Sequence, residues 1–169
     1  MPIAEPSGLG WLSGFDELMC RCGLESDGAP DFDERGQLTY ALNERIANLP
    51  AYELKLRIDD SAGTNALQGI VEESRFHSLQ LRLSTTYPTH FGSNRVAWHD
   101  EVENFGGTNT EMQMLSHTNI GQAHLEAGSR FVPKVSSVGP GNADTAAMGT
   151  GNGGLSSPPN SKFGSKCTT

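Results

Sequence analysis

The stretch DERGQLTYALNERIANL, residues 33–49, has the clearest periodicity in the chain and decides the predicted fold class. Its apolar residues recur at helical spacing, and its first two residues are acidic, as a helix N-terminus favours. Pro50 would end the helix. We therefore predict an amphipathic helix over residues 33–49, with a narrow apolar stripe that packs against one other helix. The stripe consists of Leu38, Leu42, Ile46 and Leu49.

A second amphipathic stretch covers residues 108–131, TNTEMQMLSHTNIGQAHLEAGSRF. Thr108 and Glu111 are spaced as a capping box, which favours a helix start. Gly121 and Gly128 weaken such a helix by about 1 kcal/mol each relative to alanine, so we expect it to need a partner. Its apolar seam consists of Met112, Leu115, Ile120, Ala123 and Phe131.

These two helices predict a mainly α fold, in which they pair as a coiled-coil-like hairpin. Residues 51–107 between them predict a small extended or β insertion. Apolar and polar residues alternate over 52–58 and again over 79–84, so these two segments could pair directly as a hairpin-like sheet. Residues 65–71 are too short to assign, and 85–107 favour a loop.

The remaining parts of the chain predict three regions. Residues 1–30 form an N-terminal extension with a short helix over 13–23, and residues 31–134 form the core. More than half of residues 135–169 are Gly, Ser, Pro or Asn, which predicts a disordered tail. The hydrophobic share of the chain is only 36%, so we expect a partner or self-association to complete the core.

Charge and hydropathy argue against several classes of partner. The formal net charge is −8 and no cluster of basic residues is present, so we expect no binding to nucleic acid. The chain has no apolar run of the length that spans a bilayer, so we expect no direct membrane insertion. Residues 1–10 lack the features of a cleavable signal peptide.

Titratable residues do not form a recognisable catalytic or metal-binding motif. Cys20 and Cys22 lack C-x-x-C spacing, and the five histidines are scattered. His117 and His124 would lie about 10 Å apart on one helix, too far to bind one ion together. We therefore predict no catalytic residues, no cofactor and no metal, and a protein that is not an enzyme.

Three fragments together resemble a known family. Residues 45–52 read RIANLPAY, residues 86–90 read TYPTH, and residues 108–112 read TNTEM. In this order and spacing, over about residues 34–131, they resemble the flagellar basal-body rod proteins of the proximal-rod type.

This resemblance implies a non-enzymatic structural subunit of the bacterial flagellar rod. It further implies export by the flagellar type III apparatus without a cleavable signal peptide, a location in the periplasmic rod of the basal body, and folding on assembly. The implied partners are other copies of the chain and other flagellar rod proteins.

Two other readings remain open. A small acidic binding module, such as a type III secretion chaperone, would have an α+β fold and form a stable dimer. A small hydrolase or metalloenzyme would need His99, Asp100, His117 and His124 within about 4–6 Å of one another.

Overall fold

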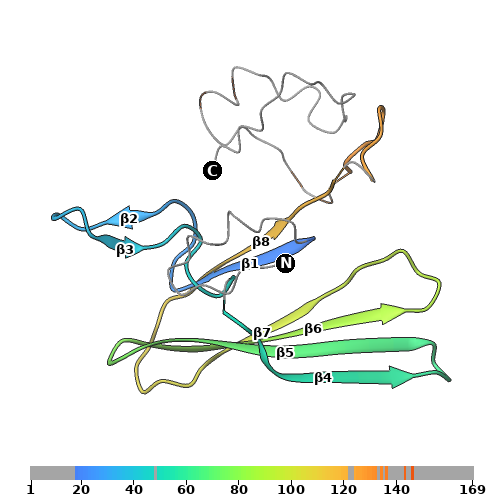
Figure 1. The fold of residues 1–169 in the computed structure, drawn as a ribbon, viewed down its shortest axis with the longest axis horizontal. Helices are drawn as coiled ribbons and strands as arrows, with labels where there is room; N and C mark the ends of the chain where they lie inside the picture. Colours follow the sequence, from blue (N-terminus) through green and yellow to red (C-terminus); the bar gives the residue numbers. More distant parts are fainter. Residues whose placement is uncertain are drawn as a thin grey trace. The chain divides into compact units, whose positions relative to one another are not determined.

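The computed structural model describes residues 18–47, 49–121 and 124–132, together with positions 134, 136, 143 and 146. The chain divides into two compact units, Met1–Thr118 and Asn119–Thr169. The strands of the described residues lie in the first unit (Figure 1). They are β1 (Met19–Leu24), β2 (Asp31–Phe32), β3 (Leu38–Tyr40), β4 (Tyr52–Asp59), β5 (Thr64–Arg75), β6 (Leu79–His90), β7 (His99–Asn104) and β8 (Gln113–Thr118).

The first unit is therefore all-β in its described part, and the predicted mainly α fold is wrong. Residues 33–49 contain β3 and irregular turns instead of a helix. The Asp33 carboxylate, which we took to favour a helix start, accepts bonds from the backbone N–H groups of Arg35 (2.9 Å) and Gln37 (2.8 Å). This bonding pattern builds the turn between β2 and β3. Asn43 and Glu44 have positive φ values of 55° and 53°, which a helix does not allow.

The other two predicted helices are likewise absent where the structure describes them, and each contains a strand flanked by irregular segments. Residues 19–24 form β1 and residues 113–118 form β8, and these two strands pair antiparallel. The spacing of apolar residues in both segments is compatible with a strand as well as with a helix. The pairing of β1 with β8 favours the strand. No helix among the described residues is long and apolar enough to cross a membrane.

The predicted seam residues do not share a face. Ile46 is in the hydrophobic core, and Leu42 packs against Cys20 and Cys22. Leu49 is half-buried in a turn region. Ala123 and most of the predicted tail lie outside the described residues. The exposed members are Leu38 in β3, Leu115 in β8, and Met112, Ile120 and Phe131 outside the strands.

A four-stranded antiparallel sheet, in the order β4-β5-β6-β7, is the largest element of the fold (Figure 1). The predicted extended segments 52–58 and 79–84 are confirmed as parts of β4 and β6. Their predicted direct pairing is wrong, because β5 lies between them. Leu56 of β4 is opposite Leu67 of β5, which is opposite Tyr87 of β6.

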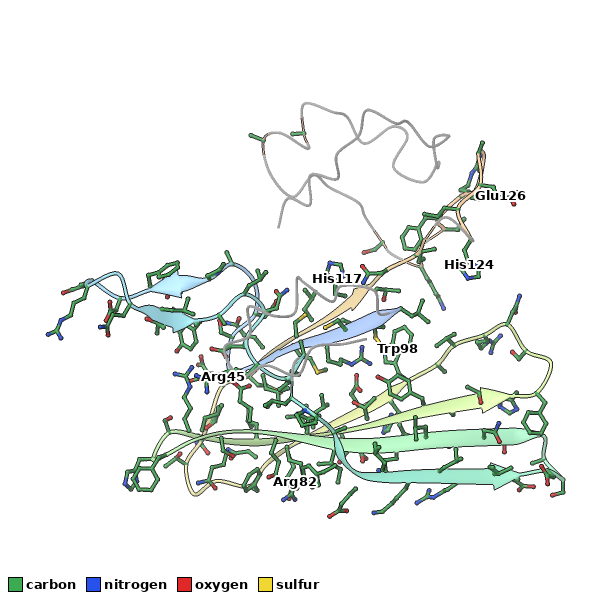
Figure 2. All side chains as sticks on the ribbon, viewed as in Figure 1. Arg45, Arg82, Trp98, His117, His124 and Glu126 are labelled. Carbon is green, nitrogen blue, oxygen red and sulfur yellow. The ribbon has the colours of Figure 1, made fainter. Side chains whose placement is uncertain are left out.

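The two faces of this sheet differ in character because side chains alternate along each strand. On one face, the Arg82 guanidinium lies between Glu72 (2.7 Å) and Glu103 (3.0 Å), forming an exposed polar ladder across three strands. Figure 2 shows Arg82 on the side of the sheet away from β1. We call this the outer face, and the face toward β1 the inner face.

The inner face carries the hydrophobic core. Leu79, Leu81 and Leu83 of β6 are buried there, and Leu24 of β1 and Ile46 pack against them. Val71 and Val102 from the flanking strands complete the cluster. Gly23 is required in β1, because a Cβ there would collide with the backbone oxygen of Gln113 in β8. The short β1–β8 ribbon therefore covers one part of the inner face.

The β4 part of the inner face is not covered by the described residues of this unit. Leu54, Leu56 and Ile58 are 66%, 63% and 60% exposed. The sequence predicts a half-buried strand over residues 52–58. The strand and its alternation are present, but its apolar side chains are exposed. The expectation that a partner completes the core stays a prediction, which these three exposed side chains favour.

We expect Leu81→Ala to lower the free energy of unfolding by about 2–5 kcal/mol, because it leaves a cavity in the centre of the core. Leu56→Ala, the matched control on the exposed part of the same face, should change it by no more than about 0.5 kcal/mol. Urea unfolding followed by circular dichroism measures both. Equal effects of the two substitutions would contradict this placement of the core.

The turn between β4 and β5 gives a second prediction. The Asp59 carboxylate accepts bonds from the Ser61 hydroxyl (2.6 Å) and the Ala62 backbone N–H (2.9 Å), and these bonds lower the pKa of Asp59. A depressed pKa stabilises the fold above the ordinary value of 3.8, and this contribution is lost as pH falls through the folded-state pKa.

Ser61→Ala removes the stronger bond, so the pKa of Asp59 should rise toward its ordinary value. An NMR titration of the Asp59 carboxyl carbon measures this, with Ser84→Ala as the control. An unchanged titration curve in Ser61→Ala would show that the turn does not form as described.

Candidate functional site

A cavity of about 350 Å³ lies between β1 and the inner face of the four-stranded sheet. Most of its wall is apolar, and one end is polar, formed by Arg21 of β1 and by Thr85 and Tyr87 of β6. Gly69 of β5 and Leu54 of β4 both line this cavity. A larger residue at position 69 would crowd the cavity wall, since a Cβ there would lie only 3.0 Å from the Leu54 side chain. The apolar wall includes Ile46, Ala47, Ala51, Leu54, Leu67, Val71 and Leu83.

A buried ion pair fixes the polar end. Arg21 Nη2 lies 2.6 Å from Asp100 Oδ2, and the two side chains are only 7% and 10% exposed. The β6–β7 register places Thr85 opposite Asp100, and the Thr85 hydroxyl donates to Asp100 Oδ1 at 2.8 Å. Both carboxylate oxygens are thus engaged, so Asp100 holds Arg21 and Thr85 in fixed positions beside the cavity.

Two aromatic rings adjoin this polar end. The Arg21 guanidinium carbon lies 5.3 Å from the centroid of the Trp98 ring, a distance at which a cation–π interaction is favourable. Figure 2 shows Trp98 on the β1 side of the sheet, opposite to Arg82. Burial raises the pKa of Tyr87, and the Asp100 charge adds to this while Arg21 opposes it. Tyr87 therefore stays a neutral hydroxyl, able to donate a hydrogen bond, at physiological pH.

Arg21 also has an unused donor. Its Nε is buried and has no hydrogen-bond partner among the described residues. The Nη1 atom contacts the Met19 sulfur. An unpaired buried N–H is costly, so this Nε leaves the polar end with unmet hydrogen-bonding capacity.

The thiols near the cavity are not suited to nucleophilic chemistry. Cys20 and Cys22 are both buried. The pKa of Cys22 is raised well above its ordinary value, first by its hydrogen bond with Cys20 and then by burial. A thiol with a raised pKa stays protonated, and the thiolate is the reactive form.

The structure does not bring together His99, Asp100 and His117, three of the four residues that a hydrolase or metalloenzyme would use. His99 lies on the outer face, 3.6 Å from Glu101, while Asp100 faces the opposite way. His117 of β8 is opposite Cys20, so alternation places it on the other face of the ribbon from Arg21. His124 belongs to the second unit.

Sequence reasoning missed the residues that line the polar end. Thr85 and Tyr87 continue the alternation of Leu79, Leu81 and Leu83, and this signal could have extended the predicted strand beyond residue 84. Arg21 gave no such signal, because a cationic residue in a buried strand contradicts the usual pattern.

Comparison with known proteins identifies the family. Residues 1–164 match the family model described as a domain of unknown function, DUF4432. The chain belongs to the DUF4432 family. A comparison with curated proteins found no match.

A solved structure shares the fold of this DUF4432 chain. It is the crystal structure of a "putative aldose 1-epimerase" from Klebsiella pneumoniae subsp. pneumoniae MGH 78578, which is 36% identical to this chain and superimposes with a TM-score of 0.80. The match covers 92% of this chain and 40% of that one. The DUF4432 chain thus spans less than half of the length of the protein it resembles.

These findings correct the predicted identity. The rod-protein resemblance is wrong, because its fragments lie on strands and turns of a fold that a different family shares. The predicted rod and chaperone functions have no support, and nothing supports a flagellar location. The prediction that the chain is not an enzyme conflicts with the name of its structural neighbour.

We expect Asp100→Ala to lower the free energy of unfolding by about 3–5 kcal/mol, because it leaves the buried Arg21 charge without its partner. Glu101→Ala changes the next residue, whose side chain points to the outer face, and should cost no more than about 0.5 kcal/mol. Denaturant unfolding of both variants measures the difference. Similar costs would mean that the Arg21–Asp100 pair is not buried as described.

Proposed function

We propose that this DUF4432 chain binds an aldose in the cavity beside Arg21, Thr85 and Tyr87, as part of a protein of the aldose 1-epimerase kind. The observation that carries the proposal is the 36% identity, over 92% of this chain, to a structure with that name. The cavity supplies a location for the sugar within the part of the fold that the two proteins share.

The chemistry of the cavity suits a sugar ring. An aldose in its ring form presents C–H groups on its faces and hydroxyl groups around its edge. The apolar wall can pack against the C–H groups, while the Thr85 and Tyr87 hydroxyls can bond to the hydroxyl edge. A volume of about 350 Å³ lies in the range of roughly 300–1,000 Å³ that is usual for small-molecule pockets.

Epimerisation at C1 needs more than binding. One group must remove the proton of the C1 hydroxyl and another must deliver a proton to the ring oxygen, so that the ring opens and recloses on the other face. Tyr87 is a neutral proton donor at the cavity, whereas both oxygens of Asp100 are already engaged. The described residues therefore offer groups that can bind a sugar, whereas the acid–base pair needs at least one further group.

Saturation-transfer NMR with glucose, galactose and the acyclic glucitol tests the proposal on the full chain. We expect transfer to the ring sugars and little to glucitol, which lacks a rigid ring. Thr85→Val and Tyr87→Phe each remove one hydrogen bond, so each should weaken binding by about 2–10-fold. Ser84→Ala, next to Thr85 but on the outer face, is the control.

The rate at which pure α-glucose reaches its anomeric equilibrium, followed by polarimetry, shows separately whether the chain catalyses epimerisation. Identical sugar affinity in Thr85→Val, Tyr87→Phe and Ser84→Ala would show that the sugar does not bind in this cavity. Absence of saturation transfer to every aldose would overturn the proposal as a whole.

A further inference from the structure

Three carboxylates from separate parts of the chain converge beside the core, away from the proposed sugar cavity. Glu25 follows β1, Glu44 precedes β4, and Glu73 belongs to β5. One oxygen from each of them lies within 4.8 Å of the other two. Glu44 and Glu73 are only 1% and 2% exposed. Carboxylates are seldom buried this completely without a partner that compensates their charge.

Two of the buried oxygens have unmet bonding capacity. Glu73 Oε2 accepts bonds from the backbone N–H groups of Leu24 (2.6 Å) and Glu25 (3.2 Å). Glu73 Oε1 has no hydrogen-bond partner among the described residues, and neither has Glu44 Oε2. Glu73 Oε1 is thus unpaired among the described residues, and Glu44 Oε2 has only an ion pair with Arg45 at 3.4 Å, so a bound cation would satisfy both oxygens.

The neighbouring arginines neutralise this cluster only in part. Arg75 Nε lies 2.6 Å from Glu25 Oε2, and its Nη2 lies 3.1 Å from Glu44 Oε1. The side chain of Arg45, labelled in Figure 2, is 46% exposed, and its Nε lies 3.4 Å from Glu44 Oε2. Two arginine side chains thus face three carboxylates, which leaves one negative charge in excess. Burial raises the pKa of Glu44, and the charge of Glu73 raises it further.

We propose that Glu25, Glu44 and Glu73 bind a hard divalent cation of the calcium type. All three ligands are carboxylate oxygens, which calcium and magnesium prefer, and the cluster includes no histidine or thiol that would favour zinc or copper. The ligands come from three separate segments with no regular spacing. Such an irregular set suits the flexible coordination of calcium better than the strict octahedron of magnesium.

The ion has a route to this site. Glu25 lines a second cavity of about 430 Å³, which also borders Glu111 of the segment before β8. This cavity is polar and is distinct from the proposed sugar cavity, because the two share no lining residue. The cation site therefore does not depend on the proposed function, and failure of sugar binding would leave it standing.

Isothermal titration calorimetry of the metal-free full chain with Ca²⁺, and separately with Mg²⁺, tests the proposal at pH 7. We expect one Ca²⁺ per chain, bound more tightly than Mg²⁺, and a rise in melting temperature when Ca²⁺ is added. Glu44→Gln and Glu73→Gln each remove one ligand charge, so each should weaken Ca²⁺ binding by at least about ten-fold. Glu101→Gln, a charge removal on the exposed outer face, should leave binding unchanged.

Two variants are used because Glu73 also accepts the backbone bonds of β1 and its substitution could unfold the chain. Glu44→Gln makes no such change, and without Ca²⁺ its melting temperature should equal or exceed that of the unaltered chain. Absence of Ca²⁺ binding by the unaltered chain would overturn the proposal. Equal binding by folded Glu44→Gln, or an equal loss in Glu101→Gln, would overturn it too.

Discussion

The packing of Leu24 in β1 against the leucines of β6 is the contact on which the rest of the first unit depends. It seats the β1–β8 ribbon on the inner face of the four-stranded sheet. Hydrophobic contact alone would let the ribbon slide, since it has no direction. Two buried polar contacts give the ribbon its position, with Arg21 bonded to Asp100 of β7 and Leu24 N–H bonded to Glu73 of β5.

These two anchors also organise the two candidate sites. At the Arg21 anchor, the carboxylate of Asp100 places the Arg21 side chain and the Thr85 hydroxyl beside an apolar cavity. At the Glu73 anchor, the carboxylate that accepts the Leu24 N–H bond also lies close to the carboxylates of Glu25 and Glu44. The same ribbon therefore connects the two polar clusters through a few residues of β1, and Leu24 of this strand packs into the hydrophobic core.

The sequence predicted the strands whose alternation is unbroken, and it failed where the pattern is mixed. Residues 52–58 and 79–84 alternate cleanly and were assigned correctly. The sequence did not predict β5, because Gly69 and Glu73 occupy inward positions and interrupt the alternation of apolar residues along the strand. Gly69 lines the cavity and Glu73 belongs to the carboxylate cluster. Residues 33–49 suggested a helix because their acidic start and apolar spacing are typical of one. The Asp33 carboxylate instead accepts backbone N–H bonds that stabilise a tight turn.

The candidate sites were not predictable from sequence patterns, for a physical reason. Arg21, Thr85 and Glu73 are polar groups at buried positions, which sequence patterns assign to surfaces. Asp100 was considered only as a partner of histidines, although alternation turns it away from His99 and Glu101. Each of these side chains gains its partner from another strand, so only the folded arrangement of the strands reveals the pair.

The central claim is that this all-β DUF4432 chain receives a sugar at the Arg21 end of the cavity. Backbone amide chemical-shift mapping of the ¹⁵N-labelled full chain, during titration with an aldose, tests it most directly. The account predicts shifts that saturate together and cluster at Arg21, Thr85 and Tyr87, with the amides of the exposed outer face unmoved. Saturating shifts confined to other strands would contradict the claim.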